Sequence, residues 1–349
     1  MPFELNEKIK SIEPYEPVLG DFRIRLDANE SFITPSGDVL DSIQQAMESI
    51  RFNRYPDPFA RELCARAGAY YGVQPELVVA GNGSDELISV ILNAFTQKGD
   101  TILSLAPDFS MYAFYSRLIE CSCIVMPKND DFTIDIDAVI ETANKENVRV
   151  IIFSNPCNPT SIGLDTLKIR KLIGSVNALV VLDEAYMDFF DKSLVKEAQS
   201  YDNLIVLRTL SKAMGMAAVR LGFSIANQTL TNAIRTAKSP YNVNAVSQAI
   251  GCAVLGHTEY IQYSITRINA SRDELFTELK RLCKATGKIT PIAADANFVF
   301  AKAEDAGGLY TALMNYGIII RRFGDYVRIT AGRNLENVEL ISAIERFYK

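Results

Sequence analysis

The chain has 349 residues, with 36 basic and 42 acidic side chains and a formal net charge of −6 at pH 7. That length allows two domains with ample cores. The acidic balance argues against nucleic acid or an anionic membrane surface as the main partner, because both need a cationic protein surface. The chain has one histidine, His257, and no tryptophan, which excludes metal sites built from two or three histidines. We assign His257 no role and expect proton transfer through Lys, Tyr, Asp or Glu.

Processing and redox signals are weak. The N-terminus mixes both signs of charge and lacks the apolar stretch of a secretory signal, and no apolar run is long enough to span a membrane. Cys121 and Cys123 are one residue short of a redox C-x-x-C spacing, and their apolar neighbours favour a strand instead. We therefore expect a reduced, cytoplasmic protein without a metal site.

Short apolar runs recur along the chain with helical patterns between them. Several runs are continuously apolar, as strands buried on both faces of a parallel sheet are. This alternation predicts an α/β fold whose large domain has three layers around a mostly parallel, seven-stranded sheet. The predicted strands cover residues 77–80, 101–105, 123–126, 148–153, 178–182, 204–207 and 221–226.

The pattern changes after the seventh run. A long helical stretch begins near Asn244, and short strands are predicted at residues 297–301, 317–320 and 326–330. We predict a large domain over residues 46–243 and a smaller α/β domain over 244–349. Residues 1–45 are too poor in periodicity to fold alone, and we expect them to pack on the small domain.

Two motifs with glycine, asparagine and proline follow predicted strands, where ligands gather in such sheets. In GNGSDE (81–86), Ser84 and Asp85 begin a helix whose free N–H groups favour an anion; an ordinary capped turn would look the same. The third glycine of a dinucleotide fingerprint is replaced by Glu86. In NPTS (158–161), Asn158 can offer an N–H to a ligand, although turn chemistry alone explains the motif.

Two further motifs carry ionisable groups. LDEAY (182–186) places Asp183 at the end of a buried strand, with Tyr186 three residues later. RTLSKA (208–213) places Lys212 in a turn after Ser211, and Arg220 follows eight residues on. A lysine in an apolar pocket can act as a Schiff-base nucleophile. Pyridoxal 5′-phosphate needs such a lysine, a carboxylate for its ring nitrogen and an anion site for its phosphate.

At these residues the sequence resembles the fold-type I pyridoxal-phosphate aminotransferases, which share the aspartate aminotransferase-like fold, and among them most of all the histidinol-phosphate aminotransferase group. The resemblance runs nearly end to end. It departs at Ser161, where the family usually has glycine. The motifs that carry it include LDANES (26–31), RYPDP (54–58), GNGSDE, NPTS, LDEAY, RTLSKA, VRLGF (219–223) and VRIT (327–330).

The resemblance implies a role for each matching residue. Lys212 would form the internal aldimine and move the proton between the substrate's Cα and the cofactor, and Asp183 would pair with the pyridine N–H. Tyr186 and Asn158 would bind the ring's 3′-oxygen, and Phe109 would stack on the ring unless it serves only core packing. The phosphate would be held by Ser84, Asp85, Ser211 and Arg220, and by Tyr55 of the partner subunit in a homodimer.

Substrate residues follow in the same way. Arg328 matches the clamp for the substrate α-carboxylate, and Arg322, Tyr15 and Tyr241 are candidates for a substrate phosphate. The function implied is exchange of an amino group between glutamate or 2-oxoglutarate and a phosphorylated or aromatic small-molecule substrate. A threonine-phosphate decarboxylase and an aromatic aminotransferase remain open on the same fold. A pyridoxal-phosphate sensor fused to a DNA-binding domain and a nicotinamide-dependent dehydrogenase are disfavoured, the first by the lack of a basic DNA-binding segment.

Overall fold

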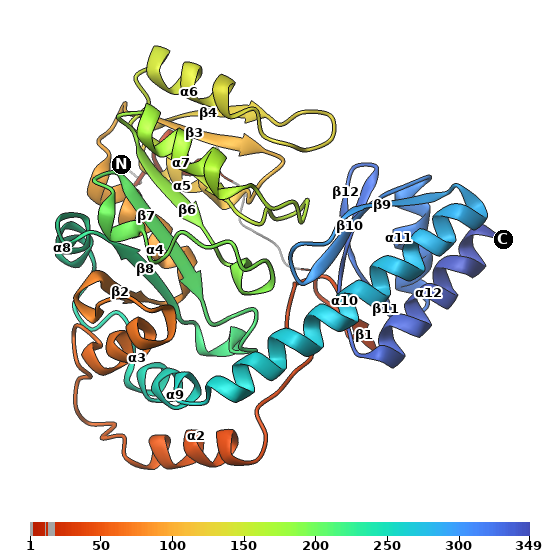
Figure 1. Ribbon diagram of the computed structural model, residues 1–349, viewed down its shortest axis with the longest axis horizontal. Helices are drawn as coiled ribbons and strands as arrows, with labels where there is room; N and C mark the ends of the chain where they lie inside the picture. The colour runs from red at the N-terminus through yellow and green to blue at the C-terminus, as the bar shows by residue number, and fades with distance from the viewer. Residues whose placement is uncertain (1–2, 11, 13–17) are drawn as a thin grey trace.

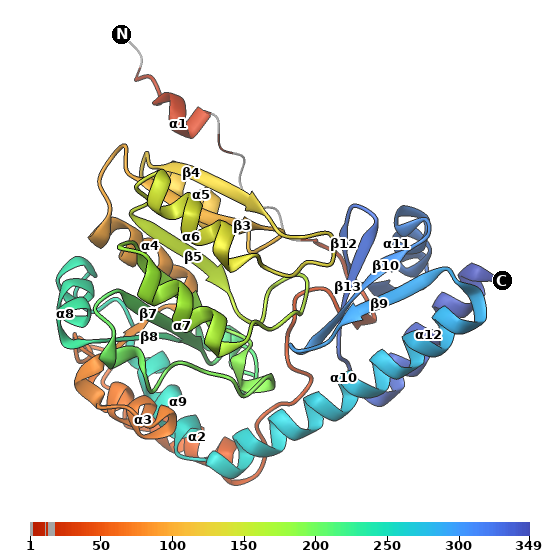
Figure 2. The same ribbon diagram turned by 45° about the horizontal axis from the view of Figure 1, so that its top comes forward.

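The computed structural model describes residues 3–10, 12 and 18–349. Figures 1 and 2 show two units side by side, with the long helix α10 (Thr258–Thr286) running from one to the other. Among the described residues, no helix is both long and apolar enough to cross a membrane.

The large unit is built on a seven-stranded sheet with the order β2-β8-β7-β6-β5-β3-β4. Only β8 runs antiparallel to its neighbours, so the predicted α/β fold with a mostly parallel sheet is confirmed. The strands are β2 (Val78–Gly81), β3 (Thr101–Ala106), β4 (Ser122–Pro127), β5 (Val150–Ser154), β6 (Leu179–Asp183), β7 (Leu204–Thr209) and β8 (Gly222–Ala226).

Helices cover both faces of this sheet, because successive strand residues point to opposite sides. In β6, Val180 and Leu182 enter one hydrophobic core, and Leu179 and Val181 enter the other. The first core is closed by α3 (Arg61–Tyr71), α6 (Ile136–Lys145), α7 (Thr166–Ser175) and α9 (Ala245–Leu255), and the second by α4 (Gly83–Phe95), α5 (Met111–Leu118) and α8 (Gln228–Ala237). Short 3₁₀ turns are η1 (Pro75–Leu77), η2 (Met187–Phe189), η3 (Ala198–Ser200) and η4 (Ala217–Val219).

The small unit has an antiparallel sheet of order β12-β13-β10-β9, which packs against α10, α11 and α12. A separate parallel pair joins β1 to β11. The elements are β1 (Ile24–Arg25), β9 (Ile289–Ala293), β10 (Phe298–Ala303), α11 (Ala306–Asn315), β11 (Ile318–Ile319), β12 (Arg321–Phe323), β13 (Tyr326–Thr330) and α12 (Asn334–Tyr348).

The N-terminal segment contacts both units, which is a wider placement than the sequence predicts. Ile24 and Leu26 join the core of the small unit. The helix α2 (Asp38–Glu48) instead packs on α9, and Lys8, in the short helix α1 (Glu7–Lys10), forms an ion pair with Glu120 of the large unit.

The change from the large to the small unit also comes later than residue 244. The helical stretch predicted there is two helices, because the chain breaks at Gly256 and His257 between α9 and α10. Val254 and Ile261 lie in the core of the large unit, whereas Leu275 lies in that of the small unit. The chain therefore leaves the large unit within α10.

Candidate active site

A cavity of about 530 Å³ lies at the carboxyl ends of β3, β5, β6 and β7. Parallel strands leave free loops at that edge of the sheet, and ligands of open α/β sheets bind there. The small unit closes the cavity with Arg321, Phe323 and Arg328, and the segment after β1 contributes Asp27 and Asn29. One cavity thus joins residues as far apart in the chain as Asp27 and Arg328, which are separated by 301 positions.

Lys212 lies in the turn between β7 and β8, and its side chain lines this cavity. The neighbouring Ala213 and Met214 are fully buried and hold the turn in place. The Lys212 Nζ donates a hydrogen bond to the carbonyl of Ala28 at 3.3 Å and lies 5.6 Å from the centre of the Tyr186 ring. The amine is therefore anchored at the cavity wall next to an aromatic face.

Asp183 ends β6 and is buried at the floor of the cavity. Its carboxylate accepts hydrogen bonds from the Tyr112 hydroxyl at 2.9 Å and from the Ala185 N–H at 3.1 Å. Burial raises the pKa of Asp183 to about 7, although both hydrogen bonds act in the opposite direction. A cationic N–H group brought against Asp183 would favour its charged form.

Tyr112 was not among the predicted site residues. It lies on α5 with its ring fully buried, and it meets the Phe109 ring edge-on at a centroid distance of 5.6 Å. Phe109 itself lines the cavity. Phe109 lies in the loop before α5 and Tyr112 lies in its first turn, so the contact between them depends on how the chain enters the helix and not on a spacing visible in the sequence.

The N-terminus of α4, together with Gly83 and Gly222, forms a backbone anion site, which we call the α4 cradle. Asn82, at the N-cap position, makes no side-chain capping bond, so the first N–H groups of the helix remain available to an anion. Gly83 has a φ of +79°, and a Cβ there would lie 2.8 Å from Nη2 of Arg220. A Cβ at Gly222 would lie 2.3 Å from the Ser84 nitrogen. Only glycine at both positions lets the backbone and the guanidinium approach so closely.

The predicted phosphate residues meet at this cradle. Ser84, Asp85, Ser211 and Arg220 all line the cavity. Oδ1 of Asp85 is buried without a hydrogen-bond partner, and burial raises the pKa of this carboxyl group while Arg220 and Lys212 lower it. The arrangement brings one guanidinium, two hydroxyls and free backbone amides to one end of the cavity.

Asn158, Tyr186 and Arg328 also line the cavity. The Arg328 guanidinium donates to Oδ1 of Asn158 and to the carbonyl of Asp27, and it lies 5.4 Å from the centre of the Phe298 ring. The Tyr186 hydroxyl accepts a hydrogen bond from Nδ2 of Asn29 at 2.9 Å. Asn29 belongs to the LDANES motif. Its contact with Tyr186 could not be predicted from the sequence, because the two residues lie 157 positions apart.

The structure places Arg321, and not Arg322, at the cavity. Arg321 pairs with Arg328 across β12 and β13, so the two side chains share one face of the sheet. Arg322 points to the other face and is exposed beside Gly307 of α11. We predicted Arg322, but side chains alternate between the two faces of a strand, so the position at the cavity falls to the adjacent Arg321.

The remaining candidates lie elsewhere. Tyr55 is 82% exposed and stacks on Tyr241 with ring centroids 4.7 Å apart; neither lines the cavity. Tyr15 lies outside the described residues. His257 makes a 2.8 Å contact from Nε2 to the Ser42 hydroxyl, remote from the cavity.

Ser161 occupies the glycine position of the NPTS motif with a φ of +61°. Its hydroxyl donates to the carbonyl of Phe298 at 3.1 Å and accepts from the N–H of Ala296 at 2.8 Å. A glycine could adopt this backbone but would offer neither bond. The serine therefore ties the turn that carries Asn158 to the small unit.

Comparisons with known proteins agree with this architecture. The sequence model of the family described as aminotransferase class I and II matches residues 23–347, and the chain belongs to that family. The chain is 40% identical to a histidinol-phosphate aminotransferase of Clostridium novyi, over 97% of this chain and 95% of that protein. It is also 40% identical to one of Clostridium kluyveri, over 98% of each chain.

Solved structures show the same fold. The crystal structure of histidinol-phosphate aminotransferase from Sinorhizobium meliloti in complex with pyridoxal-5′-phosphate superposes with a TM-score of 0.88 at 22% identity. It covers 99% of this chain, and 97% of that chain is covered in turn.

Proposed function

We propose that this protein is a pyridoxal-phosphate-dependent aminotransferase that acts on histidinol phosphate, with glutamate and 2-oxoglutarate as the second substrate pair. The observation that carries the proposal is the presence of Lys212, Asp183 and Arg328 in one cavity. The full-length likeness to histidinol-phosphate aminotransferases at 40% identity supports the choice of substrate.

The residues present fit the cofactor. Burial disfavours the charged form of Asp183 and raises its pKa to about 7. A protonated ring nitrogen beside this carboxylate would stabilise the charged form. The α4 cradle has the glycine positions and the guanidinium that a phosphate needs. Lys212 lines the same cavity. Ser84, Asp85, Ser211 and Arg220 would hold the phosphate, and Phe109 would cover the ring.

Bound pyridoxal phosphate supplies an aldehyde that condenses with amines and a cationic ring that withdraws electrons from the substrate α-carbon. The chain's own residues then set the geometry. Asp183 would pair with the protonated ring nitrogen. Lys212 is the amine placed to hold and move the proton of the substrate α-carbon, which would be general acid–base catalysis by one positioned amine. Tyr186 and Asn158 would orient the ring.

The arginines divide the substrate between them. Arg328 is buried, and its planar guanidinium suits the bidentate binding of an α-carboxylate, as glutamate requires. Arg321 lies on the same face of the small sheet and is the better candidate for the substrate phosphate than Arg322. A threonine-phosphate decarboxylase or an aromatic aminotransferase would use the same cofactor residues, so product analysis decides between them.

A homodimer is part of this proposal. Tyr55 is exposed and does not line the cavity of its own chain, so it would reach a cofactor phosphate only in a partner subunit. The adjacent Phe52 is 79% exposed, and an exposed aromatic cluster is typical of an interface between subunits. We also propose a cytoplasmic location, which the six free cysteines support.

The test is a half-reaction screen. The holoenzyme is mixed separately with histidinol phosphate, phenylalanine, tyrosine and O-phosphothreonine, and the visible absorbance of the cofactor is followed. We expect histidinol phosphate to react fastest and Lys212→Ala to abolish the reaction, whereas Lys168→Ala, on the exposed face of α7, should react normally. Carbon dioxide release from O-phosphothreonine would favour the decarboxylase, and turnover by Lys212→Ala would refute the mechanism.

A further inference from the structure

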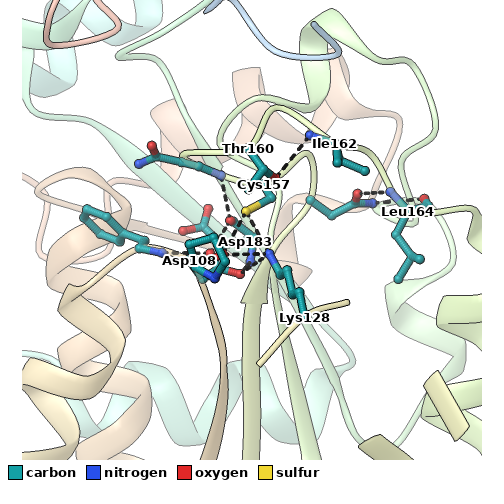
Figure 3. Close-up of polar contacts among 12 residues, drawn as sticks. Asp108, Lys128, Cys157, Thr160, Ile162, Leu164 and Asp183 are labelled. Carbon is teal, nitrogen blue, oxygen red and sulfur yellow. Dashed lines mark hydrogen bonds and ion pairs between the residues drawn. The ribbon is translucent and has the colours of Figure 1, made fainter. Parts of the chain in front are cut away.

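Three polar side chains that the proposed function does not use converge at the cavity wall, one lining the cavity and two lying behind it. They are Asp108, in the loop after β3, Lys128, directly after β4, and Cys157, in the turn after β5. Figure 3 shows them meeting beside Asp183. The side chains of Lys128 and Asp108 are each 1% exposed, and Cys157 is 2% exposed.

The contacts of Lys128 satisfy a buried ammonium group. Its Nζ donates to the carbonyl of Pro107 at 2.9 Å, contacts Sγ of Cys157 at 2.9 Å and lies 3.4 Å from Oδ2 of Asp108. A fully buried lysine is rare unless it is paired, and a buried ion pair often stabilises a protein no better than apolar residues would. This pair therefore needs an explanation other than stability.

The contacts of Asp108 lead into the active site. Its Oδ1 accepts hydrogen bonds from the N–H of Phe109 at 2.8 Å and from the Ser154 hydroxyl. The Ser154 Oγ in turn accepts from the N–H of Asn158 at 3.1 Å, and Asn158 is the acceptor for Arg328. One buried carboxylate thus holds the backbone of Phe109 directly and that of Asn158 through Ser154.

The charge of Asp108 also acts on Asp183. Titratable groups that act on Asp183 include Tyr112 from α5, Asp108 from the loop after β3 and Asp85 from α4, and Lys212 lines the same cavity. After burial, the negative charges of Asp108 and Asp85 raise the pKa of Asp183. Lys128 is the buried cation that compensates Asp108, because burial raises the pKa of Asp108 and Lys128 opposes that rise.

We propose that Lys128 is a positioning residue for the cofactor site: its ion pair with Asp108 fixes the loops that carry Phe109 and Asn158 and prevents the charge of Asp108 from opposing that of Asp183. The inference rests on the proposed function, since it concerns the same cofactor. It adds a charge pair to that function. Of the two members, Asp108 lines the cavity, whereas Lys128 does not and would act only through Asp108.

The experiment compares cofactor binding in matched variants. Apoprotein is titrated with pyridoxal phosphate, and the dissociation constant is measured across pH for the wild type, Lys128→Met, Asp108→Asn and the double variant. In Lys128→Met the uncompensated Asp108 shifts Asp183 toward its neutral form, and a shift of about one pKa unit weakens binding about tenfold. Asp108→Asn leaves Lys128 as a buried cation without a counter-charge, which disfavours a cationic ring nearby, and should therefore also weaken binding.

The double variant separates charge balance from packing. If the pair acts through charge, Lys128→Met with Asp108→Asn binds the cofactor more tightly than either single variant and returns toward the wild-type pH profile. Cys157→Ser, which keeps an acceptor for Lys128, should bind as the wild type does. Thermal unfolding of each apoprotein is recorded alongside.

The inference would be overturned by a double variant that fails to fold, or whose loss of cofactor affinity equals the sum of the losses in the single variants. It would also be overturned if Lys128→Met bound the cofactor like the wild type at every pH. A Cys157→Ser protein with the binding defect of Lys128→Met would overturn it as well. The wild-type apoprotein is titrated first. If it binds no pyridoxal phosphate, the proposed function itself is refuted and the variants are not compared.

Discussion

Replacement of Ser161 tests whether its hydroxyl repays the strained backbone at this position. Ser161 is fully buried with a φ of +61°, and its hydroxyl bridges the N–H of Ala296 and the carbonyl of Phe298. Ser161→Ala removes the hydroxyl and keeps the left-handed backbone. Ser161→Gly removes the hydroxyl and also makes that backbone favourable. The two variants therefore separate the hydrogen bonds from the conformation.

The magnitudes follow from these contacts. Loss of the hydroxyl leaves the buried N–H of Ala296 without this partner, which destabilises the fold by about 1–3 kcal/mol, so we expect about 2 kcal/mol for Ser161→Ala. Glycine recovers about 1–2 kcal/mol of left-handed strain and loses about 0.5–1 kcal/mol through the entropy of the unfolded chain. Ser161→Gly should thus be less destabilised than Ser161→Ala by roughly 1 kcal/mol.

Urea unfolding measures this difference. The chain has 15 tyrosines and no tryptophan, so tyrosine fluorescence and circular dichroism together report the transition. Ser175→Ala, at an exposed position at the end of α7, is the control and should stay within about 0.5 kcal/mol of the wild type. The reasoning fails if Ser161→Gly is as unstable as Ser161→Ala, or if Ser161→Ala unfolds like the control.

Three more predictions concern the cavity. Burial raises the pKa of Asp183 to about 7, so the folded apoprotein keeps a proton that the unfolded chain releases near pH 4. The free energy of unfolding should therefore decrease as the pH rises from about 4 to about 7, by at most about 4 kcal/mol. Asp183→Asn should remove that fall in urea unfolding at a series of pH values, and an unchanged pH dependence would contradict it. Arg321→Ala should raise the KM for histidinol phosphate at least about tenfold by removing a charged hydrogen bond, while Arg322→Ala should leave it unchanged; equal effects would argue against the assignment by strand face. Heterodimers of Tyr55→Ala and Lys212→Ala chains should recover about half of the wild-type activity, because one of their two sites is intact, and no recovery would place Tyr55 outside the partner's site.

Much of the fold could be read from local pattern. The seven apolar runs became the seven strands of the large sheet with shifts of one or two residues at their ends, because strands buried on both faces need continuous apolar sequence. The small unit was harder. Its strands β9 and β12 were not predicted, since β9 contains Pro291 and β12 has only three residues, two of them arginine.

The cavity residues divide in the same way. Lys212, Asp183 and Asn158 could be expected together because each follows a parallel strand, and such strands end at one edge of the sheet. Tyr112 and Asn29 could not, because a helix face and a left-handed residue in the N-terminal segment bring them to the site. The contact between Asn29 and Tyr186 spans 157 residues.

The sequence by itself determined the class of fold, the strand edge at which the site lies and the lysine and carboxylate at its centre, because these depend on short-range periodicity and on motifs that follow strands. The tertiary structure decided which of two adjacent arginines faces the cavity and where a buried lysine finds its counter-charge. Arg321 is selected by its pairing with Arg328 on β13, and Lys128 meets Asp108 only because β3 and β4 lie side by side. The first outcome depends on the register of β12 on β13, which the local sequence of so short and polar a strand does not specify. The second depends on which strands are neighbours in the sheet.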